Sequence, residues 1–354
     1  MALENNEKYI SRCLQLAATA ENYVAPNPMV GAVLVCDEKI IGEGCHRFYG
    51  QAHAEQNAIN AVKDKKLLEK STLYVSLEPC SHFGKTPPCA NLIIEHKIPR
   101  VVIGTFDPNP KVAGKGIQLL REAGIEVTVG VLENECRALN KRFFTFHYKK
   151  RPYIFLKWAQ TADGFIDKKR SNQEKPLIIS NTVTKQLTHK IRTQNQAIML
   201  GTNTVLADNP KLIVRRWTGR NPLRVILDRQ GRIPKTFNVM DGKTETLIFT
   251  EAEKESKPNL QFIKIDFSEN ILQTVTNELY KLNINSILVE GGAQLLSSFI
   301  SAGLWDEANV EISQQIIGNG IPAPVLNAFP HEMTEIEGHK WMRFLNFGKV
   351  FIKI

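Results

Sequence analysis

Four residues constrain this chain more than any other feature of its sequence. His53 and Glu55 stand two positions apart at the start of a helical pattern, and Cys80 and Cys89 follow within one βα unit. One histidine and two thiolates are three ligands for a metal that takes four, and a zinc site with three protein ligands keeps its fourth position open for water. A carboxylate beside such a water is what a hydrolytic proton shuttle needs. The pattern therefore predicts a catalytic zinc.

The alternatives are a structural zinc, or two free buried cysteines and a surface histidine. A structural site normally closes the fourth position with another cysteine or histidine, and none stands at ligand spacing. Histidine, two cysteines and a glutamate that is not a ligand form the signature of zinc-dependent deaminases of cytosine and adenine. We therefore favour a catalytic site with His53, Cys80 and Cys89 as ligands and Glu55 as proton shuttle.

The local pattern places this cluster over two helix N-termini. Residues two apart can share a site only in the first turn of a helix, so His53 and Glu55 are expected there. The strand predicted at 72–77 leads to the first cysteine, and Pro87-Pro88 starts a helix whose first turn carries Cys89. The partial positive charge of both helix ends favours ionised thiolates.

Length and charge suggest two domains that act on small molecules. A chain of 354 residues is long for one domain, and we expect a boundary at Lys149-Lys150-Arg151-Pro152, with domains at 1–149 and 150–354. The net charge of +9 is spread over the chain, since the first 150 residues hold 19 basic and 16 acidic side chains. This spread suits phosphorylated small molecules, and we expect no nucleic-acid partner. No apolar run approaches the length of a membrane span, so no membrane partner is expected.

The chain alternates predicted strands and helices throughout, which indicates an α/β fold. In the first half the predicted helices are 6–20, 53–62, 87–94, 116–123 and 131–147, and the predicted strands are 30–36, 39–43, 72–77, 100–104 and 125–129. In the second half the predicted helices are 181–193, 268–282 and one that begins after Gly291-Gly292, and the predicted strands are 153–159, 197–200, 223–227, 246–250, 261–265, 286–289, 308–312 and 341–354. The polar stretch from Gly201 to Pro210 is predicted to be a loop with a short turn.

The unit around Glu290-Gly291-Gly292 has the form of a phosphate-binding turn. A buried strand ends in an acid, and two glycines lead directly into a helix, whose first amides are free to bind an anion. The G-x-G-x-x-G fingerprint of a Rossmann fold is absent, and Gly-Gly also precedes helices for packing reasons alone. The residues by themselves leave a cofactor site and a packing turn equally open.

Cysteine usage and the first residues point to a reducing compartment. Six cysteines are too few for a disulfide framework in a chain of this length, and four of them, Cys13, Cys36, Cys45 and Cys136, have apolar neighbours that predict core positions. The segment Met1–Lys8 lacks the apolar stretch of a secretory signal. We expect a cytoplasmic protein.

Five motifs together resemble the bifunctional riboflavin-biosynthesis deaminase–reductases over nearly the whole chain. They are Pro26-Asn27-Pro28, His53-Ala54-Glu55, the stretch from Leu77-Glu78-Pro79-Cys80 to Pro87-Pro88-Cys89, Asp107-Pro108-Asn109-Pro110, and Thr204 to Pro210. The eight-residue gap between Cys80 and Cys89 distinguishes this family from other zinc deaminases, because cytidine and tRNA-adenosine deaminases carry the shorter P-C-x-x-C.

The resemblance implies a fold and two consecutive reactions. It implies a cytidine-deaminase-like three-layer α/β/α domain followed by a dihydrofolate-reductase-like α/β domain. The first would use one Zn²⁺ to remove the 2-amino group of a diaminopyrimidinone that carries a ribosylamino 5′-phosphate. The second would open and reduce the ribosyl group to ribityl with NADPH. We also expect a homo-oligomer.

The resemblance also implies roles for residues that the pattern leaves open. The implied deaminase substrate residues are Asn27, His46, His82 and Lys85. The implied reductase substrate residues are Lys157, Pro176, Arg192, Leu212, Arg215 and Glu290, of which two arginines suit a phosphate. The implied NADPH residues are Ala159, Ile178, Thr204, Asp208, Gly292, Ala293, Gln294, Leu295, Leu296, Ser297 and Ser298.

One segment departs from the family. The family commonly reads Ser-x-Trp-Ile-Thr before the first reductase helix, and this chain has Pro176-Leu177-Ile178-Ile179-Ser180. Pro176 and Ile178 then offer only backbone and apolar contacts. Two rival hypotheses remain: a nucleoside or tRNA deaminase with an unrelated second half, and a zinc-stabilised nucleic-acid-binding module. The first predicts indifference to NADPH, and the second predicts salt-sensitive binding to oligonucleotides.

Overall fold

The chain forms two compact units. The computed structural model describes residues 2–81, 88–110, 112–171, 174–268 and 270–346. One unit comprises Met1–Lys150 and the other Arg151–Ile354. Among the described residues, no helix has both the length and the apolar character that crossing a membrane requires.

The N-terminal unit is built on a five-stranded mixed sheet. The strand order is β2(Lys39–Cys45), β1(Gly31–Cys36), β3(Thr72–Val75), β4(Arg100–Ile103) and β5(Glu126–Val129). β1 runs antiparallel to β2 and β3, whereas β3, β4 and β5 are mutually parallel. The carboxyl ends of β3 and β4 therefore share one edge, which is where ligands bind in open α/β sheets.

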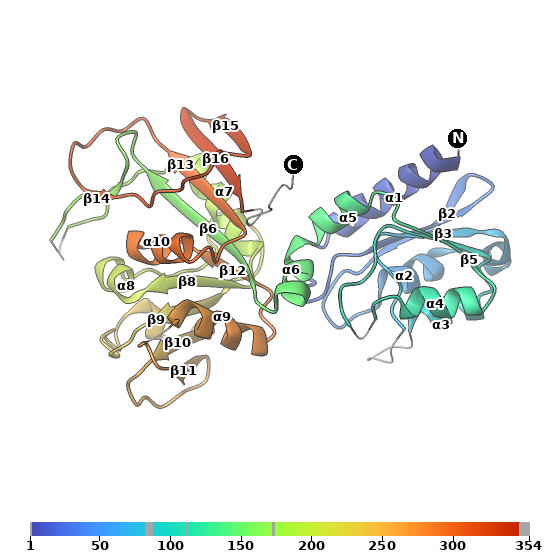
Figure 1. Ribbon diagram of the computed structural model, residues 1–354, viewed down its shortest axis with the longest axis horizontal. Coiled ribbons are helices and arrows are strands. Elements are labelled where there is room, and N and C mark those ends of the chain that lie inside the picture. Colours follow the sequence, from blue (N-terminus) through green and yellow to red (C-terminus); the bar gives the residue numbers. More distant parts are fainter. Residues whose placement is uncertain (1, 82–87, 111, 172–173, 269, 347–354) are drawn as a thin grey trace, which may run out of the picture. The chain divides into compact units, whose positions relative to one another are not determined.

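Helices cover both faces of this sheet (Figure 1). On one face lie α1(Ala2–Ala18) and α5(Glu133–Leu139), and on the other lie α2(Ala54–Ala61), α3(Cys89–Glu95) and α4(Lys115–Glu122). β1 shows how the sequence produces the three layers. Its Val33 and Val35 pack with residues of α1 in one core, and Ala32 and Leu34 pack with residues of α2, α3 and α4 in the other. This alternation is the period of two that a strand covered on both sides requires.

The helix predicted at 131–147 is interrupted. It forms α5 and then α6(Lys141–Lys149), with Asn140 between them. The buried Asn140 side chain accepts a hydrogen bond from the Met29 amide at 2.8 Å and donates one to the Met29 carbonyl at 2.9 Å. This contact, 111 residues away in sequence, is a tertiary one, so helical periodicity alone predicts a continuous helix where two helices meet.

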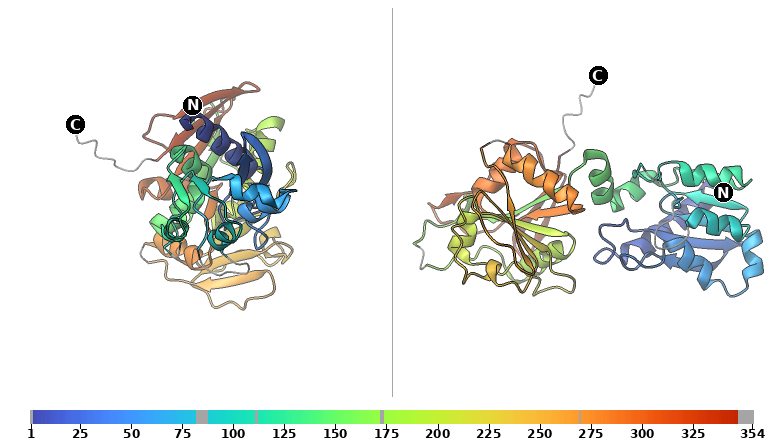
Figure 2. Two further views of the ribbon diagram at one scale, coloured as in Figure 1. Left: turned by 90° about the vertical axis from the view of Figure 1, so that its right-hand side faces the viewer. Right: turned by 90° about the horizontal axis from the view of Figure 1, so that it is seen from below.

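The C-terminal unit is built on a nine-stranded sheet. Its strands, in spatial order, are β11(Leu260–Lys264), β10(Thr246–Thr250), β9(Leu223–Leu227), β8(Ala197–Gly201), β12(Ser286–Val289), β6(Tyr153–Gln160), β13(Glu307–Ile312), β16(His339–Leu345) and β15(Glu332–Ile336). The first seven are parallel, and β16 and β15 add an antiparallel edge. In the left view of Figure 2, the yellow and orange strands lie at the bottom of this unit and the red strands lie at its top.

Helices again cover both faces. Ile191 of α7(Thr182–Thr193) and Val205 of α8(Thr202–Asp208) belong to one core, with strand residues such as Phe155. The other core contains residues of α9(Ile271–Lys281) and α10(Ala293–Ser301) packed on Leu156 and Met199. Neighbouring residues of β6 thus face opposite cores, and its near-continuous apolar sequence reflects burial on both faces.

Several predictions for the second half change. The stretch 202–208 is the helix α8 and not a loop, because Val205 and Leu206 pack inward while Asn209, with φ of 40°, ends the helix in the left-handed region. The sequence did not suggest β15 or the small pair β7(Phe165–Asp167) and β14(Ile321–Pro322). Of the strand predicted at 341–354, residues up to Leu345 belong to β16, and 347–354 lie outside the described residues. Two short 3₁₀ helices, Lys65–Lys70 and Asn238–Met240, complete the elements.

Candidate active sites

The N-terminal unit brings His53, Cys80 and Cys89 together. Nδ1 of His53 lies 3.5 Å from Sγ of Cys80 and 3.4 Å from Sγ of Cys89. The three ligand atoms all lie within 4.8 Å of one another, and the structure shows no other such cluster among its described residues. One nitrogen and two sulfurs are the donor set that Zn²⁺ prefers, so the residues present fit this metal.

Two helix starts converge on this cluster. His53 is the residue that precedes α2, and Cys89 is the first residue of α3. The Cys89 amide donates a hydrogen bond to Sγ of Cys80 at 3.3 Å. Hydrogen bonds from Cys89 and His53 lower the pKa of the Cys80 thiol to about 4, and the hydrogen bond with Cys80 raises the pKa of His53 to about 9. The site therefore favours the thiolate of Cys80, which is the form that binds metal, whereas the hydrogen bond with Cys80 and burial raise the pKa of Cys89.

Glu55 lies beside the ligands without being one of them. It is in the first turn of α2, as expected, and only 3% of its surface is exposed. Burial raises the pKa of Glu55 to about 7, against the lowering effect of nearby His53. A carboxyl group with a pKa near 7 can both accept and release a proton at neutral pH, which is what acid–base catalysis requires.

A cavity of about 380 Å³ is lined by His53, Cys80 and Glu55, together with Asn27 and His46. His46 is buried, in contrast to the usual solvated loop histidine. Its Nδ1 lies 3.1 Å from the carbonyl of Ala52, which can only accept, so Nδ1 carries the proton. Nε2 then accepts from Nδ2 of Asn27 at 3.1 Å. Burial lowers the pKa of His46, and the neutral ring orients the Asn27 amide.

The same cavity contains residues that the sequence did not single out individually. Asp107 and Asn109, from the segment after β4, line it, as do Tyr49 and Gln51. Burial and the nearby Glu78 carboxylate raise the pKa of Asp107 to about 7, against the lowering effect of the hydrogen bond from the Asn109 amide. The Asp-Pro-Asn-Pro motif could have identified the first two, since its prolines fix the turn that presents them. The expected substrate residues His82 and Lys85 lie outside the described residues.

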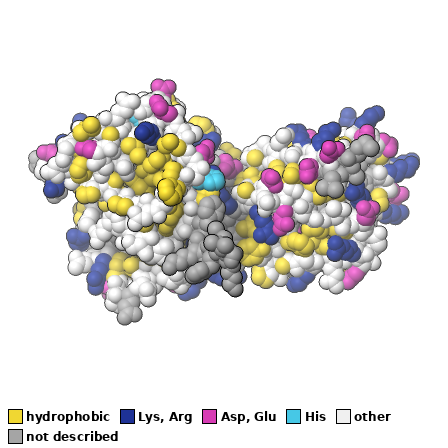
Figure 3. All heavy atoms as spheres, turned by 45° about the horizontal axis from the view of Figure 1, so that its top comes forward, with side chains coloured by type: hydrophobic (Ala, Val, Ile, Leu, Met, Phe, Trp, Pro, Cys, Tyr) yellow, Lys and Arg dark blue, Asp and Glu magenta, His cyan; other side chains and the backbone are white. Residues whose placement is uncertain are grey.

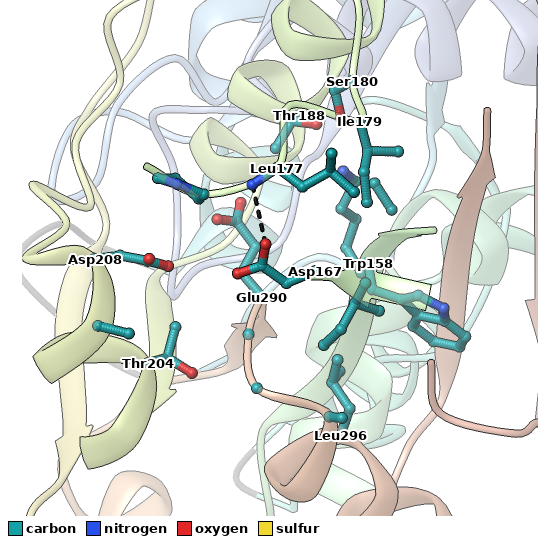
Figure 4. Close-up of a pocket in the computed structure, with 18 of the residues that line it drawn as sticks. Trp158, Asp167, Leu177, Ile179, Ser180, Thr188, Thr204, Asp208, Glu290 and Leu296 are labelled. Carbon is teal, nitrogen blue, oxygen red and sulfur yellow. Dashed lines mark hydrogen bonds between the residues drawn. The ribbon is translucent and has the colours of Figure 1, made fainter. Parts of the chain in front are cut away.

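The C-terminal unit contains a larger cavity, of about 860 Å³, at the carboxyl ends of its parallel strands (Figure 4). Of the residues expected to bind the second substrate or NADPH, thirteen line it: Lys157, Ala159, Pro176, Ile178, Arg192, Thr204, Asp208, Arg215, Glu290, Gly292, Ala293, Gln294 and Leu296. They come from β6, α7, α8, α10 and the loops between these elements.

Two buried ion pairs organise this cavity. Arg192 donates to both carboxylate oxygens of Glu290, from Nε at 2.8 Å and from Nη2 at 2.5 Å. Burial by itself raises the pKa of Glu290, but the Arg192 guanidinium and other cations lower it below its usual value. Lys157 pairs with the fully buried Glu311, its Nζ lying 3.4 Å from Oε2. Both carboxylates are therefore ionised and fixed, and each holds a cationic side chain at the cavity wall.

His189 is a cavity residue that sequence reasoning missed. Its side chain is buried on α7, and its Nδ1 accepts a hydrogen bond from the Arg215 amide at 3.1 Å. Burial, together with the charges of Arg192 and Arg215, lowers the pKa of His189 to about 4. The ring is neutral at pH 7 and fixes the backbone of the segment that carries Arg215. The only sequence signal was its position near Arg192 on the predicted helix.

The departing segment 176–180 is held mainly through its backbone. The Leu177 amide donates to Asp167 at 3.0 Å, as the dashed line in Figure 4 shows, and the Ile178 carbonyl accepts from Gln315 at 3.0 Å. The Ser180 hydroxyl donates to Glu311 at 2.6 Å, which links the segment to the partner of Lys157. The side chain of Ile178 is 67% exposed at the rim.

Four of the expected residues do not line the main cavity. Leu212 is 3% exposed in the hydrophobic core and has φ of 51°. Leu295 and Ser298 line an adjoining cavity of about 250 Å³, and Ser297 lines neither. The structure therefore divides the predicted NADPH stretch between two neighbouring hollows.

The Gly291-Gly292 turn leaves no room for side chains. A Cβ on Gly291 would lie 2.5 Å from Cδ2 of Leu200, and one on Gly292, where φ is 73°, would lie 2.8 Å from the Thr204 hydroxyl. The turn leads into α10, so Gly291, Gly292 and Ala293 line the cavity at a helix N-terminus. An anionic dinucleotide fits such a close approach of ligand to backbone.

Comparisons with known proteins match a family to each of the two units. Residues 3–105 match the family described as the cytidine and deoxycytidylate deaminase zinc-binding region, and residues 152–340 match the RibD C-terminal domain. A riboflavin biosynthesis protein RibD from Aquifex aeolicus is 40% identical over 326 residues, covering 91% of this chain and 90% of its own length. The same protein of Bacillus amyloliquefaciens is 41% identical over 329 residues, covering 90% of this chain and 87% of its own length.

The structural comparison gives the same result. The crystal structure of a diaminohydroxyphosphoribosylaminopyrimidine deaminase/5-amino-6-(5-phosphoribosylamino)uracil reductase from Thermotoga maritima has a TM-score of 0.87. It is 37% identical, and the match covers 97% of this chain and 99% of that one. Fold and sites define a two-part enzyme, in which a zinc-dependent deaminase of the cytidine-deaminase type precedes a dihydrofolate-reductase-like, NADPH-dependent reductase. The chain belongs to the RibD family of riboflavin biosynthesis proteins.

Proposed function

We propose that this chain carries out two consecutive steps on one phosphorylated pyrimidine. The N-terminal unit deaminates 2,5-diamino-6-ribosylamino-4(3H)-pyrimidinone 5′-phosphate, and the C-terminal unit reduces the ribosyl group of the product to ribityl with NADPH. The observation that carries the proposal is the joint presence of the His53, Cys80 and Cys89 cluster with its buried Glu55, and of a second cavity with the Arg192–Glu290 pair. The Thermotoga maritima relative is named for both activities.

In the deaminase, the residues of the chain hold the metal, move protons and orient the substrate. His53, Cys80 and Cys89 would hold Zn²⁺, which when bound supplies a Lewis acid that activates water. A Glu55 carboxylate oxygen accepts a proton from the attacking water and delivers it to the departing amine nitrogen. Asn27, fixed by neutral His46, offers its amide to the pyrimidine ring.

In the reductase, the chain binds the phosphate and orients the sugar. NADPH, when bound, supplies a hydride. Arg215 lies at the exposed rim and Arg192 on the wall of the same cavity, where they can bind the substrate phosphate. Lys157 and Glu290 are the ionisable groups placed to assist the proton transfer that accompanies ring opening. The amides of the Gly291-Gly292 turn bind the anionic part of the cofactor.

The most direct test measures NADPH oxidation by the full chain when the diaminopyrimidinone phosphate is the only pyrimidine present. Because the reductase acts on the deaminated product, NADPH oxidation then requires both units to work in series. We expect NADPH oxidation that matches ammonia release one for one. Ammonia release from cytidine or from tRNA, with no response to NADPH, would instead favour a nucleoside deaminase.

We further propose that the protein is a homo-oligomer. Hydrophobic side chains gather on the C-terminal unit in Figure 3, and Ile316, Val325, Phe329 and Met333 are 75%, 74%, 97% and 62% exposed. Where exposed apolar side chains form a contiguous patch, they mark an interaction surface. Sedimentation of the wild-type chain and of a Phe329→Asp variant tests this, since only the wild type is expected to run as an oligomer.

We also propose a cytoplasmic location. All six cysteines are free thiols in the structure, and two of them belong to the zinc cluster. An oxidising compartment would pair such thiols, whereas a reducing one keeps them available as ligands. Fractionation of cells that produce the protein, followed by immunodetection, tests this.

A further inference from the structure

The buried carboxylate of Glu78 accepts hydrogen bonds from four backbone amides. It stands two residues before the ligand Cys80 and is only 3% exposed. Its Oε2 accepts from the amides of Asp107 at 3.2 Å and Gly114 at 3.0 Å. Its Oε1 accepts from the amides of Gly116 at 3.0 Å and Ile117 at 3.4 Å. One side chain thus holds four backbone N–H groups of a single segment.

These amides belong to the segment from Asp107 to Ile117, described apart from residue 111, which joins β4 to α4. Asp107, Asn109 and Val112 of this segment line the deaminase cavity. Gly114, which precedes α4, has φ of 80° and carries no side chain that could cap the helix. Glu78 therefore supplies from another loop the acceptor that the first turn of α4 lacks locally.

The backbones of the two loops also lie against each other. A Cβ on Gly116 would lie 2.0 Å from the carbonyl oxygen of Pro79, the residue between Glu78 and Cys80. The Glu78 amide in turn donates to the Thr105 carbonyl at 3.0 Å, just after β4. The ligand turn and the cavity-lining segment are therefore fixed to each other at this one point.

We propose that Glu78 is a positioning residue for the deaminase reaction, which sets the substrate-facing segment 107–117 in register with the zinc-ligand turn. This inference rests on the proposed function and adds to it a determinant of substrate binding. Glu78 lies outside the reacting atoms, so its effect falls on the Michaelis constant and leaves metal content and the chemical step nearly intact. If Glu78 only stabilised the fold, its replacement would not raise the Michaelis constant while leaving metal content and the chemical step intact.

The test is Glu78→Gln in the full chain, with Glu95→Gln, an exposed glutamate on α3, as the matched control. Glutamine keeps the size but replaces one acceptor oxygen with an NH₂ group that cannot accept from two amides. We expect the Michaelis constant for the diaminopyrimidinone phosphate to rise about tenfold, with kcat within about threefold and one zinc per chain retained. The reductase rate of the same preparation gives the amount of active C-terminal unit, and the retained zinc reports that the deaminase unit is folded.

A second measurement is independent of activity. Amide hydrogen exchange in peptides covering 105–120 is expected to accelerate at least about tenfold in Glu78→Gln and to stay at the wild-type rate in Glu95→Gln. If wild-type chain failed to deaminate the pyrimidine, the proposed function would fall while this exchange result could still stand. Unchanged exchange, an unchanged Michaelis constant or loss of zinc would each overturn the positioning role.

A second variant covers the case in which Glu78→Gln does not fold. Gly116→Ala forces the segment away from Pro79 without removing a charge. We expect it to raise the same Michaelis constant and to accelerate the same amides. A Gly116→Ala chain with wild-type values of both would contradict the proposal.

Discussion

Glu55 is the residue whose replacement separates chemistry from metal binding. Because it is buried beside the cluster but contributes no ligand atom, Glu55→Gln is expected to keep one zinc per chain. Ammonia release is expected to fall by about 10³-fold, since a positioned general base contributes roughly 10²–10⁴-fold. Zinc analysis and an ammonia assay on the same sample measure both. Full deaminase activity in this variant would exclude the proton-transfer role.

His189 gives the reductase unit a pH-dependent stability. Its folded pKa of about 4 lies below the ordinary value of 6.5, so the unfolded chain takes up a proton that the folded chain does not. Stability is therefore fully present above pH 6.5 and is lost as the pH falls towards 4. The groups that face this histidine are Arg192, Arg215, Arg216 and Glu290, of which the three arginines disfavour its charge.

Tryptophan fluorescence can follow this effect in one unit, because all four tryptophans lie after residue 151. We expect the urea midpoint to drop between pH 7 and pH 5 in the wild type and to drop less in His189→Gln. The exposed His331→Gln serves as the control and should keep the wild-type difference. Equal pH differences in all three proteins would contradict this origin.

At the residue scale, the sequence predicted which residues form the sites better than it predicted the hydrogen bonds that orient them. Sequence spacing predicted that His53, Cys80 and Cys89 lie together beside Glu55, as they do in the structure, because the residue types and the helix start that presents them are local properties. Family resemblance supplied Asn27 and His46, but only the structure shows the hydrogen bond that joins them. His189 could not be predicted as a cavity residue because its partner is a backbone amide 26 positions away.

Among the elements, the junction of α5 and α6 offers a direct measurement. Asn140→Ala removes both hydrogen bonds to Met29 and leaves a buried amide and carbonyl unpaired. We expect the deaminase unit to lose about 2–4 kcal/mol, since each unsatisfied buried group costs about 1–3 kcal/mol. Loss of deaminase activity against urea concentration, compared with the exposed Asn91→Ala on α3, measures it. A cost equal to that of the control would show that Asn140 does not hold the junction.

Most helices and strands were predicted from hydrophobic periodicity. The wrong predictions occur where tertiary contacts decide the local structure. Strands such as 223–227 and 246–250 were predicted with their observed bounds, because burial on one or both faces is recorded in their own residues. The helix α8 was mistaken for a loop because five of its seven residues are polar or small, and only packing of Val205 in the core decides its state. The break at Asn140 likewise depends on a distant partner.

At the scale of the whole molecule, metal removal should divide the two activities. The zinc cluster lies entirely in Met1–Lys150, and the larger cavity entirely in Arg151–Ile354. Treatment with a chelator is expected to abolish ammonia release while NADPH oxidation on the deaminated pyrimidine continues at the wild-type rate. Added Zn²⁺ should restore deamination. Parallel loss of both activities would show that the reductase depends on the metal.

The way in which segment 176–180 is anchored has a consequence for protein engineering. Its hydrogen bonds with Asp167 and Gln315 use the main chain, and the Ser180 hydroxyl adds a side-chain hydrogen bond to Glu311. Substitution at 176 and 178 can therefore change the rim of the cavity while leaving the attachment of the segment intact. A combinatorial library that varies these two positions and keeps Ser180 constant is therefore suited to changing the ligand preference of the cavity.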